Sequence, residues 1–162
     1  MSQSDFFLKI DGIDGESTDD KHKGELEIQS WSWGATNMGT FGAGGGGGSG
    51  KADFSDITIT KYADKSTPKL LKAVATGQHI KTMVLVCRKA GGDKQEYLKL
   101  TLTDVLISSY HSSAAGGSSP IPSESIGLNY AVINYEYKPQ KVDGSLEGAV
   151  AVSYDRHANK AT

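Results

Sequence analysis

The chain has 162 residues and a mass of 17.2 kDa, which fits one domain over residues 1–162 that can bury about 70% of its unfolded surface. Its 17 basic and 19 acidic residues give a formal net charge of -2, a balance that argues against a dedicated nucleic-acid binder. Hydrophobic residues make up 37% of the chain and no apolar run approaches the roughly 18 residues of a membrane-spanning helix, so no membrane insertion is expected.

Short strands separated by turns account for most of the sequence. The predicted strands cover residues 6–10, 26–33, 57–62, 83–87, 97–107 and 126–137. In three of them, 26–33, 97–107 and 126–137, the apolar alternation inverts partway along. Each inversion requires a bulge or a sharp bend, because side chains in a strand alternate with a period of two. Repeated bends are typical of strongly curled sheets, so the pattern favours a mainly β fold built as a small closed β-barrel.

One segment, residues 67–76, is predicted to be an α-helix. Thr67 fits the N-cap, Pro68 fits the first helical position, and Gly77 can end the helix in a left-handed conformation. The expected helical residues that anchor it in the core are Leu70, Leu71 and Val74. We therefore expect one short amphipathic helix that plugs or flanks the barrel.

A pair of tryptophans stands out in the second predicted strand. Trp31 and Trp33 lie on one side of this strand and Ser32 lies on the other. A tryptophan side chain buries on the order of 200 Å², so both rings are predicted to be core anchors. Ser32 then faces either solvent or the inner surface of an assembly.

Three long segments are expected to be loops: residues 11–24, 34–51 and 111–124. Loops of this length are uncommon as simple connections and are expected to serve a function or an interface. Within the second, residues 45–51 match the phosphate-binding pattern G-x-x-x-x-G-K, but Ala52 lacks the hydroxyl that binds magnesium. The residues that follow alternate like a strand, whereas phosphate binding needs a helix N-terminus there. We therefore expect no nucleotide and no other cofactor.

Neither a metal site nor a catalytic site is indicated. The acidic loop from Asp11 has Glu16 and His22 where an EF-hand needs glycine and glutamate. No histidine is paired with another histidine or with Cys87 at metal-ligand spacing. No nucleophile motif surrounds a serine, and Cys87 lies in an apolar strand rather than at a helix N-terminus. We expect a protein that is not an enzyme.

Six segments, in order along the chain, resemble the haemolysin-coregulated protein (Hcp) family, the tube subunits of bacterial type VI secretion systems. They are residues 7–10 with 15–17, residues 31–34, the glycine-rich segment ending at Gly50-Lys51, residues 60–62 with 64–68, residues 88–92, and residues 137–141. The resemblance spans residues 6 to about 141. The residues after it match less clearly and carry no assigned role.

The resemblance implies a β-barrel of two sheets with one helix, which forms homohexameric rings. These rings stack into a tube inside contractile sheath proteins, with a spike protein of the VgrG family at the tip and small effector proteins in the lumen. It also implies a protein that is cytoplasmic until it is fired and then secreted. This agrees with residues 1–12, which show no Sec-type signal, and with the lone Cys87, which favours a reducing compartment.

Two surfaces are expected to serve such a tube. Ser32 is predicted to face the lumen. The residues expected to contribute to ring stacking are Gly44, Gly46, Gly48, Ala90, Gly91 and Gly92.

A second hypothesis comes from another class of protein. The long loops and aromatic residues such as Tyr110 also fit a monomeric β-barrel module that binds a carbohydrate or another small ligand. Light scattering separates the two hypotheses, because the module would have the monomer mass of 17.2 kDa.

Overall fold

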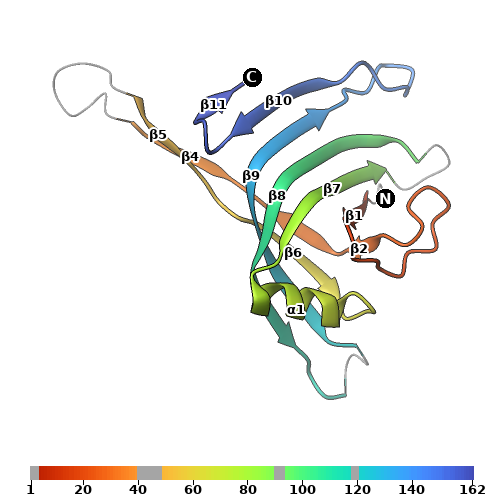
Figure 1. The fold of residues 1–162 in the computed structure, drawn as a ribbon. Coiled ribbons are helices and arrows are strands. Elements are labelled where there is room, and N and C mark those ends of the chain that lie inside the picture. The colour runs from red at the N-terminus through yellow and green to blue at the C-terminus, as the bar shows by residue number, and fades with distance from the viewer. Residues whose placement is uncertain (1–3, 40–48, 90–93, 118–120) are drawn as a thin grey trace.

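The computed structural model describes residues 4–39, 49–89, 94–117 and 121–162, and the fold is mainly β with one helix (Figure 1). In chain order the elements are β1 Ser4–Ile10, β2 Leu26–Ile28, β3 Ser30–Ser32, β4 Ala35–Gly39, β5 Ser49–Phe54, β6 Ile57–Tyr62, α1 Thr67–Thr76, β7 His79–Lys89, β8 Glu96–Ser113, β9 Ser123–Tyr137, β10 Val150–Asp155 and β11 Lys160–Ala161. Within these residues, no helix is both long and apolar enough to cross a bilayer.

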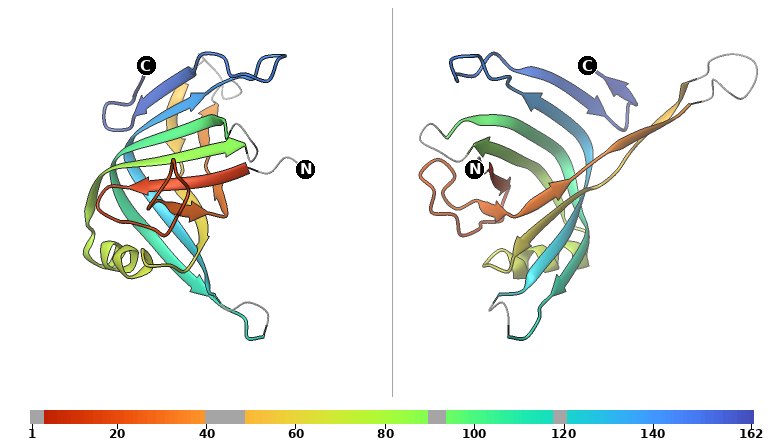
Figure 2. Two further views of the ribbon diagram at one scale, coloured as in Figure 1. Left: turned by 90° about the vertical axis from the view of Figure 1, so that its right-hand side faces the viewer. Right: turned by 180° about the vertical axis from the view of Figure 1, so that it is seen from behind.

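Nine strands form one curled antiparallel sheet, and two form a separate ribbon. The sheet runs in the order β11-β10-β9-β8-β7-β1-β2, and β6 pairs with both β9 and β3. The remaining strands, β4 and β5, pair with each other and project away from the curled sheet, as Figure 1 and the right-hand view of Figure 2 show. The segment 34–51 was expected to be a loop, and this was wrong for the residues that form β4 and the start of β5, while residues 40–48 lie outside the described residues. These strands lack an apolar alternation because they pack on no core of their own.

The predicted bends are confirmed by the pattern of burial. The segment 26–33 divides at Gln29 into β2, which pairs with β1, and β3, which pairs with β6. In β8, both Leu102 and Val105 are buried, and between them Asp104 has a positive φ of 53°. The inversion of the alternation thus marks the place where each strand turns with the curled sheet.

The sheet is not closed, and in this respect the expectation of a closed barrel is corrected. β9 is long enough for one of its edges to pair with two different strands: Ile57–Tyr62 of β6 along its first half and Val150–Asp155 of β10 along its second half. These two partners diverge, so the hydrogen-bonded path ends at β11 and at β2. Gln29, the residue between β2 and β3, links the two edges of the sheet at this point, because its backbone amide donates to the Thr60 carbonyl of β6 at 2.8 Å.

One hydrophobic core fills the curled sheet, and α1 covers one end of it. Its largest fully buried side chains include Leu8, Leu85, Leu100 and Ile59, drawn from four different strands. Because these strands are far apart in sequence, the core is built mostly from long-range contacts. Burial of such side chains is the main favourable term in folding.

The helix begins and ends where the sequence predicted, with two corrections. Ser66 rather than Thr67 is the N-cap, while Gly77 ends the helix with a φ of 65°. Leu70 is fully buried and Val74 packs partly against the core, but Leu71 is 51% exposed, so the prediction of Leu71 as a core anchor was wrong. Each residue advances about 100° around a helix, so the side facing the sheet takes Leu70 and Val74 and leaves Leu71 outside.

Candidate functional site

Ser32 and the two tryptophans lie on opposite faces of the wall. Ser32 is exposed at the end of β3, while Trp31 and Trp33 are partly buried against the core. The Trp33 indole Nε1 donates to the Tyr130 hydroxyl at 2.6 Å. Trp31 lies beside Cys87, whose thiol pKa is raised by burial to about 11. The thiol therefore stays protonated and is a poor nucleophile.

Ser32 belongs to a face of small, mostly hydroxyl-bearing residues that crosses four strands, here called the hydroxyl face. Its residues are Ser30 and Ser32 on β3, Thr58 and Thr60 on β6, Ser125 and Gly127 on β9, and Ser109 and His111 on β8. Two cross-strand rows build it. In the first, Ser32 pairs with Thr58, Thr58 with Gly127, and Gly127 with Ser109; the second runs in the same way from Ser30 to His111.

The alternation of the strands explains why these residues share a face. Ile57 and Ile59 point into the core, so Thr58 points outward beside Gly127. A Cβ atom at Gly127 would lie 2.5 Å from the Ser109 hydroxyl, so a side chain there would displace its neighbours. Of the eight positions, only His111 carries a titratable group. The eight positions thus carry small or hydroxyl-bearing side chains and a single titratable group, so the face is nearly uncharged and rich in groups that can donate or accept hydrogen bonds.

The β4–β5 ribbon is the second exposed feature. All five residues of β4 are exposed, and Met38 is 80% exposed. At its base the chain is fixed, because the Gly34 amide donates to the Ser55 hydroxyl and the Ser55 amide donates to the Gly34 carbonyl, at 3.0 and 2.9 Å. The ribbon is therefore anchored at one end, and the residues of β4 are exposed along its whole length.

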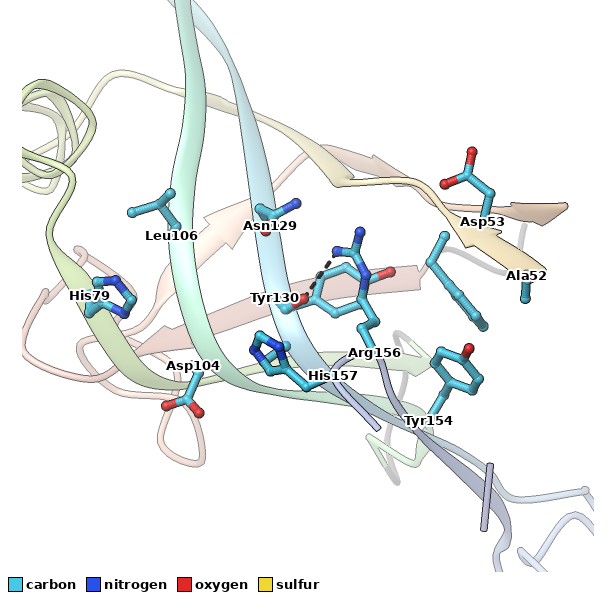
Figure 3. A pocket seen from close by; sticks show the side chains of 12 residues that line it. Ala52, Asp53, His79, Asp104, Leu106, Asn129, Tyr130, Tyr154, Arg156 and His157 are labelled. Atoms are coloured by element: carbon cyan, nitrogen blue, oxygen red, sulfur yellow. Dashed lines mark hydrogen bonds between the residues drawn. The ribbon is translucent and has the colours of Figure 1, made fainter. Parts of the chain in front are cut away.

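A hollow of about 640 Å³ lies beside the base of the ribbon, between β5 and the turn after β10 (Figure 3). Arg156 lies over the Tyr130 ring at 5.2 Å from its centre, and its Nη1 donates to the Tyr130 carbonyl at 3.1 Å. His79, Asp104 and His157 also line the hollow. Across the described parts of the chain, no group of three or more histidine, cysteine or carboxylate side chains is placed to hold a metal ion.

The most buried charged groups form a structural network at the start of α1. The Lys61 ammonium donates to the Glu124 carboxylate at 2.6 Å, the Asp64 carboxylate at 3.0 Å and the Tyr62 carbonyl at 2.9 Å. These contacts use all three of its protons. Glu124 also accepts from the Tyr110 hydroxyl, whose pKa is raised to about 12 by burial and by this carboxylate. Because the partners are satisfied among themselves, the network fastens α1 rather than presenting reactive groups.

Only some of the site residues predicted from the sequence lie in the part of the chain that the structure describes. Ser32 is placed on an exposed face, whereas Gly44, Gly46, Gly48 and the segment 90–92 lie outside the described residues. The remaining residues of the hydroxyl face were missed. The alternation of threonine with isoleucine at residues 57–60 was a signal for them, but its meaning depends on which strands lie beside it.

Comparison with known proteins gives one consistent result. Residues 7–137 match the family model described as "Type VI secretion system effector, Hcp". The chain is 44% identical over 145 residues to Protein hcp1 of Pseudomonas aeruginosa, covering 89% of each chain. A solved structure described as a type six secretion system protein superposes with a TM-score of 0.94 at 36% identity, covering 99% of this chain and 100% of the other. Hcp1 from Salmonella typhimurium gives a TM-score of 0.78 at 36% identity, covering 98% and 99%.

Proposed function

Since the chain belongs to the Hcp family of type VI secretion proteins, we propose that it is a structural tube subunit whose copies close into a ring of six. Rings of this kind would stack into the inner tube of a contractile sheath, with a spike protein at the tip. The subunit would be cytoplasmic until sheath contraction expels it and would then be secreted. This role requires no catalytic group, cofactor or metal.

The observation that carries the proposal is the β4–β5 ribbon. An isolated two-stranded hairpin is at best marginally stable in water, and this one projects from the body with every β4 residue exposed. A second copy of the chain can cover it. A contact between different surfaces of identical chains closes into a ring or continues as a stack, and both arrangements occur in a tube of stacked rings.

The hydroxyl face supports a lumen wall. Cargo must move past the wall of a channel without being held, which favours small uncharged side chains over charged or large apolar ones. Ser32, Thr58 and Ser109 provide such a surface across adjacent strands. We assign Ser32 to the lumen, where it would touch small effector proteins.

Substitution of Ser32 tests this assignment. Ser32→Ala should leave folding, assembly and effector secretion unchanged, whereas Ser32→Glu should reduce effector co-purification and secretion while the protein itself still assembles. Ala75→Glu, at an exposed position of α1, changes the net charge by the same amount; it is the matched control and should not affect cargo. Normal effector secretion by Ser32→Glu would remove this face from the lumen.

Stacking of rings is assigned to the ribbon and the segments that adjoin strand ends. Gly44, Gly46 and Gly48 follow β4 in the chain, and Ala90, Gly91 and Gly92 follow β7. Deletion of residues 44–48 should leave rings and melting temperature unchanged and abolish secretion. Tubes that form normally with the shortened segment would show that it only connects two strands.

The competing function is a monomeric module that binds a carbohydrate or another small ligand. The hollow beside Arg156 and Tyr130 is the feature that favours it, since aromatic rings and hydrogen-bonding groups line it together. Light scattering should report six times the chain mass of 17.2 kDa for the tube subunit. A monomer at micromolar concentration would favour the module.

A further inference from the structure

The base of the ribbon is held by a cluster of aromatic rings, here called the aromatic clasp, which consists of Trp33, Phe54, Tyr130, Tyr135 and Tyr154. Phe54, the last residue of β5, stacks on Tyr154 with ring centres 4.3 Å apart. Trp33 stacks on both Phe54 and Tyr135, each at 6.0 Å. The clasp thus joins the base of the ribbon to β9 and β10. Each such contact adds about 0.5–1.5 kcal/mol to the burial of the rings.

Hydrogen bonds tie the same base to the curled sheet. The Tyr130 hydroxyl accepts from the Trp33 indole at 2.6 Å and donates to the Ser55 carbonyl at 2.9 Å. Ser55 in turn exchanges hydrogen bonds with Gly34. The residues that precede β4 and follow β5 are therefore fixed together, and both are linked to one side chain of β9.

The C-terminal hairpin, β10 with β11, closes the clasp from the other side. Tyr154 lies near the end of β10, and its hydroxyl donates to the side chain of Asn159. Arg156 then joins this turn to β9, because its amide donates to the Ala131 carbonyl at 2.8 Å and its guanidinium to the Tyr130 carbonyl at 3.1 Å (Figure 3). This hairpin lies beyond residues 7–137, the part of the chain that the family model matches.

We propose that Tyr154 and Arg156 are positioning residues that hold the ribbon base, so that the ribbon leaves the curled sheet in one fixed direction. This inference rests on the proposed function only for what the ribbon meets, a second copy of the chain. The sequence assigned no role to the C-terminal hairpin. By fixing the direction of the ribbon, this hairpin controls how the ribbon docks on a second copy of the chain, without needing to contact that copy itself.

The orientation of the ribbon base determines where the far end of the ribbon lies. A five-residue strand spans about 17 Å at roughly 3.4 Å per residue, so a tilt of about 20° at the base moves its far end by about 6 Å. A displacement of that size exceeds the length of a hydrogen bond and would prevent the ribbon from meeting a preformed surface. Loss of the clasp should therefore impair docking more than it impairs folding.

A distance measurement separates positioning from simple stabilisation. In a Cys87→Ala background, spin labels are placed at Asn37→Cys on β4 and Lys99→Cys on β8, both exposed positions. Labelled chains are diluted into unlabelled ones, so that only distances within one subunit contribute. The parent should give a narrow distance distribution. Tyr154→Ala should broaden it or shift it by several Å, and Tyr154→Phe, which keeps the ring, should not.

The controls and outcomes distinguish this inference from the proposed function. Tyr137→Ala, on the same sheet but outside the clasp, should leave the distribution unchanged. If Tyr154→Ala broadens the distribution and its folded rings no longer stack, the result supports both the positioning role of the clasp and the role of the ribbon in stacking. If the distribution broadens but the rings stack normally, the clasp positions the ribbon but the ribbon does not take part in stacking. An unchanged distribution in folded Tyr154→Ala overturns the inference. Should that variant fail to fold, Arg156→Gln is measured in the same way, with the same two readings.

Discussion

Replacing Lys61 by methionine should lower the free energy of unfolding by about 3–5 kcal/mol, because it leaves a buried carboxylate without its cation. The side chains of Lys61 and Glu124 are both fully buried, and their charged atoms lie 2.6 Å apart. Methionine fills a volume similar to that of lysine, so the loss reflects the unpaired charge and not a cavity. Thr67 and Tyr110 still donate to Glu124 in this variant, which keeps the expected loss within that range.

The size of the effect can be read as a melting temperature. For a chain of 162 residues, 1 kcal/mol corresponds to about 2–4 °C, so Lys61→Met should melt about 6–20 °C lower. The double variant Lys61→Met with Glu124→Gln removes the buried charge as well. It should recover a large part of the loss, because a buried pair is often replaceable as a unit while either half alone is not.

Urea unfolding followed by tryptophan fluorescence, together with thermal melts by circular dichroism, measures these differences. Protein concentration must be held constant, because assembly contributes to apparent stability. Lys72→Met on the exposed side of α1 is the matched control and should change stability by no more than about 0.5 kcal/mol. If Lys61→Met cost less than about 1 kcal/mol and the double variant were no more stable, the network would not hold a buried charge as described.

Three further predictions concern the wall and the N-terminal segment. Gly15→Ala should destabilise the protein by about 1–3 kcal/mol, since a Cβ there would lie 2.5 Å from a backbone carbonyl, whereas Gly148→Ala, with open space around it, should be neutral in the same urea titration. The Arg88 guanidinium holds the pKa of Asp19 far below its usual 3.8, so this pair stabilises the fold above about pH 4 and loses its effect as the pH falls. Asp19→Asn should therefore have a lower free energy of unfolding than the parent at pH 7, and the two values should converge in acid. Parallel pH profiles of stability for the two proteins would contradict this. Burial raises the pKa of Cys87 to about 11, so a thiol reagent at pH 8 should label it only as fast as the protein opens, and rapid labelling of the folded protein would refute that placement.

How far the sequence predicts this fold depends on whether the signal is local. The change of alternation at Gln29 and again at Asp104 marks real bends, because the apolar positions of a strand show which of its faces is buried. The helix limits are also local signals, since Pro68 and Gly77 act within one turn. Leu71 was misplaced because the position of a side chain around a helix depends on how the helix sits against the sheet.

The ribbon and the hydroxyl face needed information that the sequence does not show directly. β4 pairs only with β5 and all of its residues are exposed, so it lacks the apolar alternation by which strands are recognised; β5 reaches the core only at its last residue, Phe54. Thr58 and Gly127 share the hydroxyl face only because β6 pairs with β9 in one register. Both features follow from contacts between distant parts of the chain, and composition could only indicate that such segments are unusual.

Electron cryomicroscopy of the purified 162-residue chain tests the central claim most directly. The account predicts ring-shaped particles with six-fold symmetry, in which Ser32 and the rest of the hydroxyl face line the central opening and the ribbons reach neighbouring copies. Single 17.2 kDa particles, or a closed ring whose opening is lined by the α1 side of the subunit, would contradict it.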